Sequence, residues 1–140
     1  MSRHLAAGAL VAGLALTGAA PAFAHHSFAM FDRTRRVTLE GTVREFQWGN
    51  PHAWIQVVAA PADGKSAQEW GVELGSVNML MRQGWRSATL KPGDKVAMVI
   101  NPMVNGSATG SLISVTLADG RVLGPGGAPV PASGNAPAPK

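Results

Sequence analysis

The chain contains no cysteine and no tyrosine, and only 14% of its 140 residues are charged. Without cysteine it can form no disulfide, no thiolate zinc or iron–sulfur site, no cysteine nucleophile and no lipid anchor on cysteine. A metal ion would therefore be held by histidine, carboxylate, methionine or backbone groups. The net charge of +4 is modest and does not by itself indicate a nucleic-acid-binding surface. At this length we expect one small domain with appended segments.

Motifs of the common enzyme classes are missing as well. The sequence has no Gly-x-Ser-x-Gly nucleophile elbow, no phosphate-binding loop and no dinucleotide-binding glycine motif. Beyond the amino-terminal stretch, no run of residues is long and apolar enough to span a bilayer. A binding protein is therefore the first expectation, and neither a nucleic-acid partner nor a membrane span is expected for the processed chain.

Residues 1–24 have the three parts of a secretory signal peptide. Arg3 supplies the positive charge, the stretch 5–20 is uncharged and apolar, and Ala22-Phe23-Ala24 is a small-residue cleavage site. Cleavage after Ala24 creates a chain that begins at His25. We therefore expect a periplasmic or secreted protein.

Alternation of apolar and polar residues predicts five strands in the remaining chain. In the first strand the alternation changes phase near Glu45 and Phe46, which predicts a bulge or a sharp bend. The segment Gly49-Asn50-Pro51 is a turn signal between the first two strands. The expected strands cover residues 37–48, 52–60, 68–74, 95–101 and 110–117.

A helical spacing of apolar residues follows the third expected strand. Ser76 is the expected N-cap of this short helix and Gly84 its expected stop. The apolar stripe that should face the core consists of Val77, Leu80, Met81 and Trp85.

The order of these elements predicts a mainly β protein. We expect a small five-stranded OB-like barrel over residues 25–123, with one short helix between strands three and four. A small β-sandwich is the alternative. Residues 124–140 are rich in Pro, Gly and Ala and are expected to be a disordered tail.

Three histidines remain after the expected cleavage: His25, His26 and His52. The new terminal amine and the His25 ring can chelate one ion together, and His26 or His52 can add a third nitrogen. A nitrogen-rich set of this kind suits Cu(II) above other divalent metals, so copper binding is the first hypothesis. The alternative is that the two terminal rings are solvated at a disordered chain end.

His52 begins the second expected strand, and Glu73 ends the third. If these strands pair as a hairpin, His52 or Trp54 comes near Glu73 on the surface where OB barrels usually bind ligands. His52 and Glu73 are therefore a candidate pair for metal ligation or proton transfer. The alternative is a surface imidazole that bonds a carboxylate for structural reasons.

A second hypothesis needs no metal. Trp48, Trp54 and Gln56 are expected beside Glu73 on one barrel face, where exposed tryptophans would anchor a partner protein or a small ligand. An enzyme that uses His52 and Glu73 as acid and base is the third hypothesis, ranked last because no nucleophile or cofactor motif accompanies the pair.

The methionines are a further source of metal ligands, because a thioether suits Cu(I). Met81 on the helix stripe and Met98 inside a strand are expected to fill gaps in the core instead. Met30 stays a candidate ligand, with the alternative that it plugs one mouth of the barrel together with Phe28 and Phe31. The methionines considered are Met30, Met79, Met81, Met98 and Met103.

Several short motifs together resemble a family of small exported bacterial proteins that is defined only as a domain of unknown function. The resemblance extends over about residues 25–123, and it implies no established activity. His25, His26, His52 and Glu73 fall within its motifs, whereas Ser76-Val77 departs from the Ser-Pro that is usual there. The motifs are HHSFAMFD at 25–32, GTV at 41–43, FQW at 46–48, NPH at 50–52, WGVE at 70–73, RQGW at 82–85 and LKPGD at 90–94.

Overall fold

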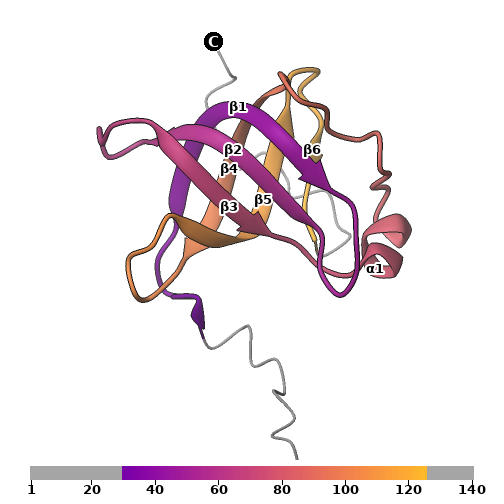
Figure 1. Ribbon diagram of the computed structural model, residues 1–140, viewed down its shortest axis with the longest axis horizontal. Helices are drawn as coiled ribbons and strands as arrows, with labels where there is room; N and C mark the ends of the chain where they lie inside the picture. Colours follow the sequence, from indigo (N-terminus) through magenta and orange to yellow (C-terminus); the bar gives the residue numbers. More distant parts are fainter. Residues whose placement is uncertain (1–29, 126–140) are drawn as a thin grey trace, which may run out of the picture.

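The computed structural model describes residues 30–125 of the chain. The expected signal peptide, His25, His26 and residues 126–140 of the expected tail lie outside these described residues. The described part forms six strands and one short helix (Figure 1). The elements are β1 (Val37–Gln47), β2 (Trp54–Pro61), β3 (Gln68–Glu73), α1 (Val77–Arg82), β4 (Lys95–Pro102), β5 (Thr109–Leu117) and β6 (Val122–Leu123).

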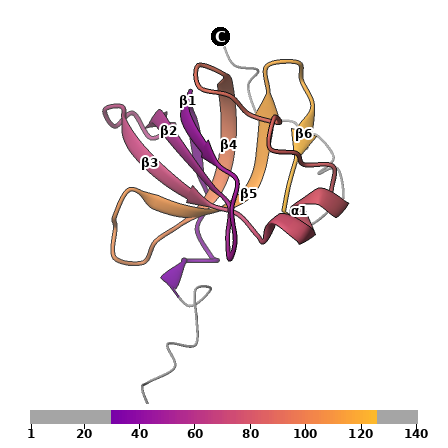
Figure 2. The ribbon, with the colours of Figure 1, turned by 45° about the vertical axis from the view of Figure 1, so that its right-hand side comes forward.

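The first five strands close into a barrel (Figures 1 and 2). β1 lies between β2 and β4, β3 pairs with the other edge of β2, and β5 pairs with the other edge of β4. A parallel pairing of β3 with β5, in which Glu73 is opposite Ser111, completes the ring. Because α1 lies between β3 and β4, the predicted five-stranded barrel with one short helix is confirmed, and the sandwich alternative is not formed.

β1 pairs with β2 along one edge and with β4 along the other, and it contains a bulge. Its pairing with β2 changes register between Val43 and Glu45, which makes Arg44 the bulged residue. The phase change in the sequence predicted this feature one residue later. Near the middle of β1, the carbonyl oxygen of Val58 occupies the place where Gly41 would carry a side chain, so these strands approach too closely for any other residue.

Alternate residues of β2 face the barrel interior, as predicted. Ile55 and Val57 are completely buried, whereas Val58, the residue after Val57, is 42% exposed. Burial of a Val, Leu or Ile side chain is worth roughly 1.5–3 kcal/mol relative to leaving it in water, so the alternation sets the register. The core consists of Leu39, Val43, Ala53, Ile55, Val57, Ala59, Trp70, Val72, Leu74, Leu80, Trp85, Leu90, Val96, Met98, Ile100, Leu112, Val115 and Leu117.

The carboxyl end of α1 is a Schellman motif. Gly84 has a φ of +88°, its N–H donates to Met81 O at 3.3 Å, and the N–H of Trp85 donates to Leu80 O at 3.1 Å. Leu80 and Trp85 are both completely buried, which supplies the apolar contact that this motif usually has. The expected stop at Gly84 is therefore confirmed, with a left-handed glycine as its physical cause.

The buried stripe of α1 is narrower than predicted. Met81, expected in the core, is 43% exposed, and Met79 is 39% exposed. The helix has only six residues and Leu80 is its one buried side chain, so a single turn contacts the barrel. Met98, in contrast, is completely buried inside β4, as predicted.

β6 was not predicted, because two residues are too short to show an alternation. It pairs antiparallel with β5 outside the five-stranded ring. The indole N–H of Trp85 then donates to the carbonyl of Gly124 at 3.3 Å. This contact fixes the chain after β6 against the helix end of the barrel.

The segment before β1 is attached to the loop between β4 and β5. Phe31 is 5% exposed and forms an isolated antiparallel bridge with Met103. The N–H of Asp32 donates to Pro102 O at 2.8 Å, and Met30 O accepts from the N–H of Val104 at 2.9 Å. Phe31 is thus buried against this loop, whereas Met30, expected to plug the barrel with it, is 46% exposed, and Phe28 lies outside the described residues.

No helix within residues 30–125 combines the length and apolarity needed to cross a bilayer.

Candidate functional site

The loop between β1 and β2 brings His52 to the end of β3. The N–H of Ala53 donates to Gly75 O at 3.0 Å, and the N–H of Leu74 donates to Ala53 O at 2.9 Å. Trp54, the first residue of β2, is opposite Glu73 in the sheet. His52 therefore lies just beyond the strand end, on the same face as Trp54 and next to Glu73.

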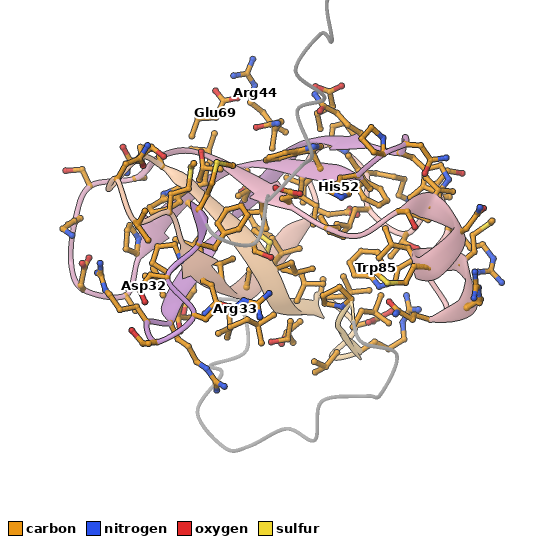
Figure 3. The ribbon with its side chains drawn as sticks, turned by 90° about the horizontal axis from the view of Figure 1, so that it is seen from below. Asp32, Arg33, Arg44, His52, Glu69 and Trp85 are labelled. Carbon is orange, nitrogen blue, oxygen red and sulfur yellow. The ribbon has the colours of Figure 1, made fainter. Side chains whose placement is uncertain are left out.

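His52 Nδ1 contacts Glu73 Oε1 directly. The position of His52 is labelled in Figure 3. The strand pairing predicted this proximity, and Glu73 lies opposite Trp54 as expected. Its side chain is only 8% exposed, however, so it is covered rather than solvated. Glu73 is the one charged side chain that is buried among the described residues. A buried carboxylate is costly unless it is paired, so the imidazole is its necessary partner.

This contact determines which nitrogen of His52 is available. When Nδ1–H donates to the carboxylate, the neutral ring has its lone pair on Nε2. The His52 side chain is 26% exposed, so a ligand can reach this nitrogen.

A cavity of about 270 Å³ lies beside the pair. Its lining comes from the β1–β2 loop, the end of β3, the start of α1, β5 and the segment after β6. Apolar atoms make up most of the lining, with the imidazole and the carboxylate as its titratable groups. Among the residues that line it are His52, Glu73, Gly75, Met79, Ser111 and Pro125.

Met79 and Ser111 were not selected from the sequence as part of this site. Ser111 reaches the cavity because β5 pairs in parallel with β3, opposite Glu73. Met79 reaches it because α1 starts immediately after β3 and turns back toward its end. The placement of Ser111 depends on how the barrel closes, which local sequence patterns do not show.

Trp48, Trp54 and Gln56 were expected on one barrel face, but the structure places Trp48 apart from the other two. On β2 and β3, a side chain at Gly71 would meet Gln56 Oε1 at 3.5 Å and Trp54 Cζ3 at 3.8 Å, so these two side chains lie over Gly71. Trp48 instead packs on the core, in an edge contact with Phe46 at a centroid separation of 5.5 Å. Trp54 and Gln56 therefore continue the His52 face, and Trp48 is held by core packing.

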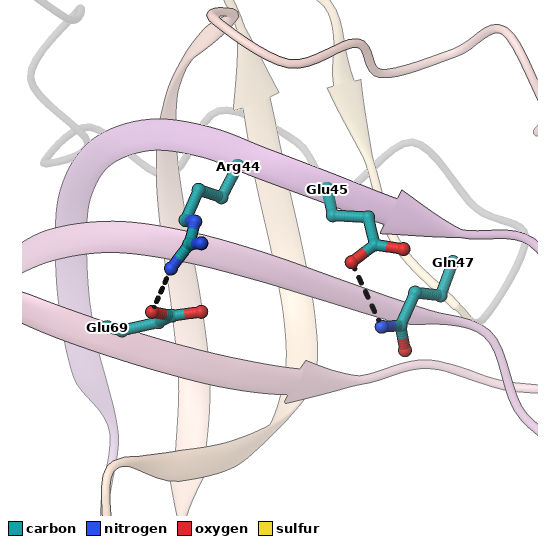
Figure 4. Close-up of polar contacts among 4 residues, drawn as sticks. All are labelled: Arg44, Glu45, Gln47 and Glu69. Carbon is teal, nitrogen blue, oxygen red and sulfur yellow. Dashed lines mark hydrogen bonds and ion pairs between the residues drawn. The ribbon is translucent and has the colours of Figure 1, made fainter.

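An ion pair and a side-chain hydrogen bond lie on the neighbouring outer surface (Figure 4). Arg44 reaches from β1 across β2 and bonds Glu69 of β3 at 2.5 Å, and Gln47 donates to Glu45 at 3.2 Å. The side chains of Arg44 and Glu69 are 64% and 48% exposed. Exposed ion pairs of this kind contribute at most about 1 kcal/mol to folding stability. We therefore treat this area as ordinary solvated surface and not as part of the candidate site.

The described residues alone do not complete a metal site of ordinary composition. Within residues 30–125, no three His, Cys, Asp or Glu side chains are grouped closely enough to hold an ion. His52 and Glu73 are brought together, whereas His25 and His26 lie outside the described residues. Further ligands would come from another residue type or from the amino-terminal segment.

Comparison with known proteins gives a family without a function. Residues 13–113 match the model of DUF6152, described as a family of unknown function. This match confirms the resemblance seen in the short motifs. No curated protein matches the chain significantly, and no solved structure does so either.

Proposed function

The chain belongs to DUF6152, a family of unknown function, and from its site we propose that it is an exported protein that binds a transition metal, copper in the first place. His52 is a ligand through Nε2, and Glu73 orients the His52 ring. The His25 amine and the rings of His25 and His26 supply the remaining nitrogen ligands. Copper is preferred because a set of amine and imidazole nitrogens without thiolate suits Cu(II).

The contact between His52 Nδ1 and the buried Glu73 carboxylate carries this proposal. Metal-binding histidines almost always donate their second ring N–H to a carboxylate, a carbonyl or water, which fixes the tautomer and makes the ligand nitrogen more basic. Burial keeps Glu73 from turning toward solvent. The ring is thereby held with one nitrogen paired and the other available to an ion.

The length of the amino-terminal segment allows His25 to take part. The bridge between Phe31 and Met103 attaches this segment at the end of the barrel where the β1–β2 loop also lies (Figures 1 and 2). Phe31 lies six positions after His25, and an extended chain covers about 3.3–3.6 Å per position, so its reach is roughly 20 Å. Signal cleavage after Ala24 is needed to create the amine, which makes export the event that activates the site.

The test is titration of Cu(II) into protein that begins at His25, followed by calorimetry and EPR. Matched samples carry one additional residue before His25, or His52→Ala. We expect each change to weaken Cu(II) binding by at least about tenfold, because even loss of an orienting group costs 10–100-fold. Equal affinity in the extended protein would exclude the amine as a ligand, and unchanged affinity in His52→Ala would overturn the proposed function.

A metal-free binding module is the second candidate, favoured by the half-buried Trp54 and Gln56 next to the cavity. The cavity volume of about 270 Å³ is close to the lower limit for small-molecule pockets. In this case the protein binds its partner protein or small ligand equally well in the presence of a metal chelator. Trp54→Ala then abolishes binding, and replacement of His25 and His26 does not affect it.

A further inference from the structure

The end of the Met79 side chain lies directly over Gly75 in the lining of the cavity. Its terminal methyl carbon occupies the position where any other residue at Gly75 would have its Cβ. Gly75 does not have a positive φ, so backbone conformation is not the reason for glycine here. What the absence of a side chain provides is room for the end of Met79, beside His52 and Glu73.

The other described methionines are not placed in this way. Met98 is completely buried, and the sulfur of Met103 accepts a hydrogen bond from Ser107 Oγ at 3.1 Å. Met30 and Met81 are 46% and 43% exposed, close to the 39% of Met79, but neither lines the cavity. Among residues 30–125, Met79 is the one methionine that lines the cavity with His52.

We propose that Met79 Sδ and His52 Nε2 together bind Cu(I) in this cavity, an inference that rests on the proposed metal-binding function. A thioether is a soft ligand that selects Cu(I), whereas amine and imidazole nitrogens also accept Cu(II). The site therefore holds the reduced ion through one sulfur and at least one nitrogen. Met79 decides which oxidation state is preferred, and the amino-terminal nitrogens strengthen binding of the oxidised ion.

The charge of the site agrees with a monovalent ion. Glu73 is a single buried carboxylate, and most of the cavity lining is apolar. One Cu(I) ion beside one carboxylate leaves no net charge, whereas Cu(II) leaves one uncompensated positive charge beside a mostly apolar lining. Uncompensated buried charge is expensive, so the monovalent ion is favoured within the cavity.

The experiment compares protein beginning at His25 with its Met79→Leu variant. Affinity for Cu(I) is measured anaerobically by competition with a chromogenic Cu(I) chelator, and affinity for Cu(II) by calorimetry. Leu has nearly the same volume as Met, so the fold is retained. Met81→Leu is the matched control, because Met81 is on the same helix and similarly exposed but does not line the cavity.

We expect Met79→Leu to weaken Cu(I) binding by at least about tenfold and to leave Cu(II) affinity within about threefold. Met81→Leu should change neither. X-ray absorption of the Cu(I) complex should show a sulfur neighbour in the unsubstituted protein and none in Met79→Leu. Unchanged Cu(I) affinity in Met79→Leu, or the absence of a sulfur neighbour, would overturn the inference.

His52→Ala separates this inference from the proposed function. If His52→Ala weakens binding of both ions while Met79→Leu weakens neither, the metal site stands and only the thioether is excluded. If His52→Ala also leaves both affinities unchanged, the metal-binding function itself is wrong. Loss of Cu(I) affinity in both variants, with Cu(II) affinity lost only in His52→Ala, supports both proposals.

Discussion

Asn50, in the loop after β1, caps the helix that carries Met79: its side-chain Oδ1 accepts a hydrogen bond from the N–H of Val77 at 3.2 Å. Ser76 occupies the N-cap position, as predicted, but its hydroxyl makes no capping bond. The cap therefore comes from a residue two positions before His52. This single bond fixes the histidine loop and the start of α1 relative to each other.

Replacement of Asn50 by Ala should lower the free energy of unfolding by about 0.5–2 kcal/mol, the usual cost of a lost N-cap. Ser76→Ala should change it by much less, because Ser76 provides no side-chain bond to lose. Urea denaturation of the two variants measures the difference. A larger loss in Ser76→Ala than in Asn50→Ala would contradict this assignment of the cap.

Glu73→Gln tests the orienting role of the buried carboxylate. Glutamine has the same shape and can still accept the hydrogen bond from His52 Nδ1–H, so folding is retained. The amide lacks the negative charge of the carboxylate partner, and loss of such a partner typically weakens metal binding, so we expect affinity for Cu(II) to fall by roughly 10–100-fold.

The matched control is Glu69→Gln. Glu69 is on the same strand, but its side chain is 48% exposed and pairs with Arg44 rather than with a histidine. Its substitution should leave metal affinity unchanged. Equal affinities of the Glu73→Gln and Glu69→Gln variants, measured by calorimetry, would rule out Glu73 as a group that tunes the metal ligand.

The sequence predicted the burial of β2, the bulge in β1 and the end of α1, because each of these is determined by neighbouring residues in the chain. The alternation in β2 reports burial directly, because a slip by one residue would expose Ile55 and Val57. The phase change near Glu45 reported the bulge, since an extra residue shifts every later side chain to the other face. Gly84 is readable as a stop because few residues other than glycine adopt its φ of +88° easily.

Contacts between segments that are distant in the chain were harder to predict from the sequence. Hairpin pairing predicted the approach of His52 to Glu73, but burial of Glu73 depends on β5 and α1, which close over the end of β3. Met81 was wrongly expected in the core, because the spacing of apolar residues does not reveal that the helix has only one turn against the barrel. The short β6 pairs with β5 at Val115 and Thr116, beyond the residues of β5 that pair with β3.

Gly75→Ala should displace the end of Met79 from the cavity floor. The added methyl group would collide with Met79 Cε, the far end of a flexible side chain, so the side chain can rotate away. We expect a stability loss of about 1 kcal/mol or less and a clear fall in Cu(I) affinity. Chelator competition and urea denaturation measure the two effects.

Gly49→Ala is the control for that substitution, because a Cβ at Gly49 would have no neighbour within 4 Å. Its Cu(I) affinity should equal that of the unsubstituted protein. If Gly75→Ala binds Cu(I) as tightly as Gly49→Ala does, the position of Met79 over Gly75 has no part in binding.

Asp32 provides a pH-dependent contribution to the attachment of the amino-terminal segment. Its Oδ1 accepts hydrogen bonds from Thr34 Oγ1 at 2.6 Å and from Thr34 N–H at 3.0 Å. These bonds, the hydroxyl bond foremost, hold the pKa of the Asp32 carboxyl below its ordinary value. A lowered pKa in the folded state means that the ionised form stabilises folding above the unfolded-state pKa of about 3.9, and that this stabilisation disappears as the pH falls through the folded-state value.

Asp32→Asn should therefore have a lower melting temperature than the unsubstituted protein at pH 6, since the neutral amide is the weaker acceptor. As the pH falls below about 3.9, the difference should shrink, because the unsubstituted carboxyl also becomes neutral. Thermal unfolding followed by circular dichroism at pH 6 and in acid measures both differences. A difference that stays constant or grows in acid would show that the charge of Asp32 does not stabilise the turn before β1.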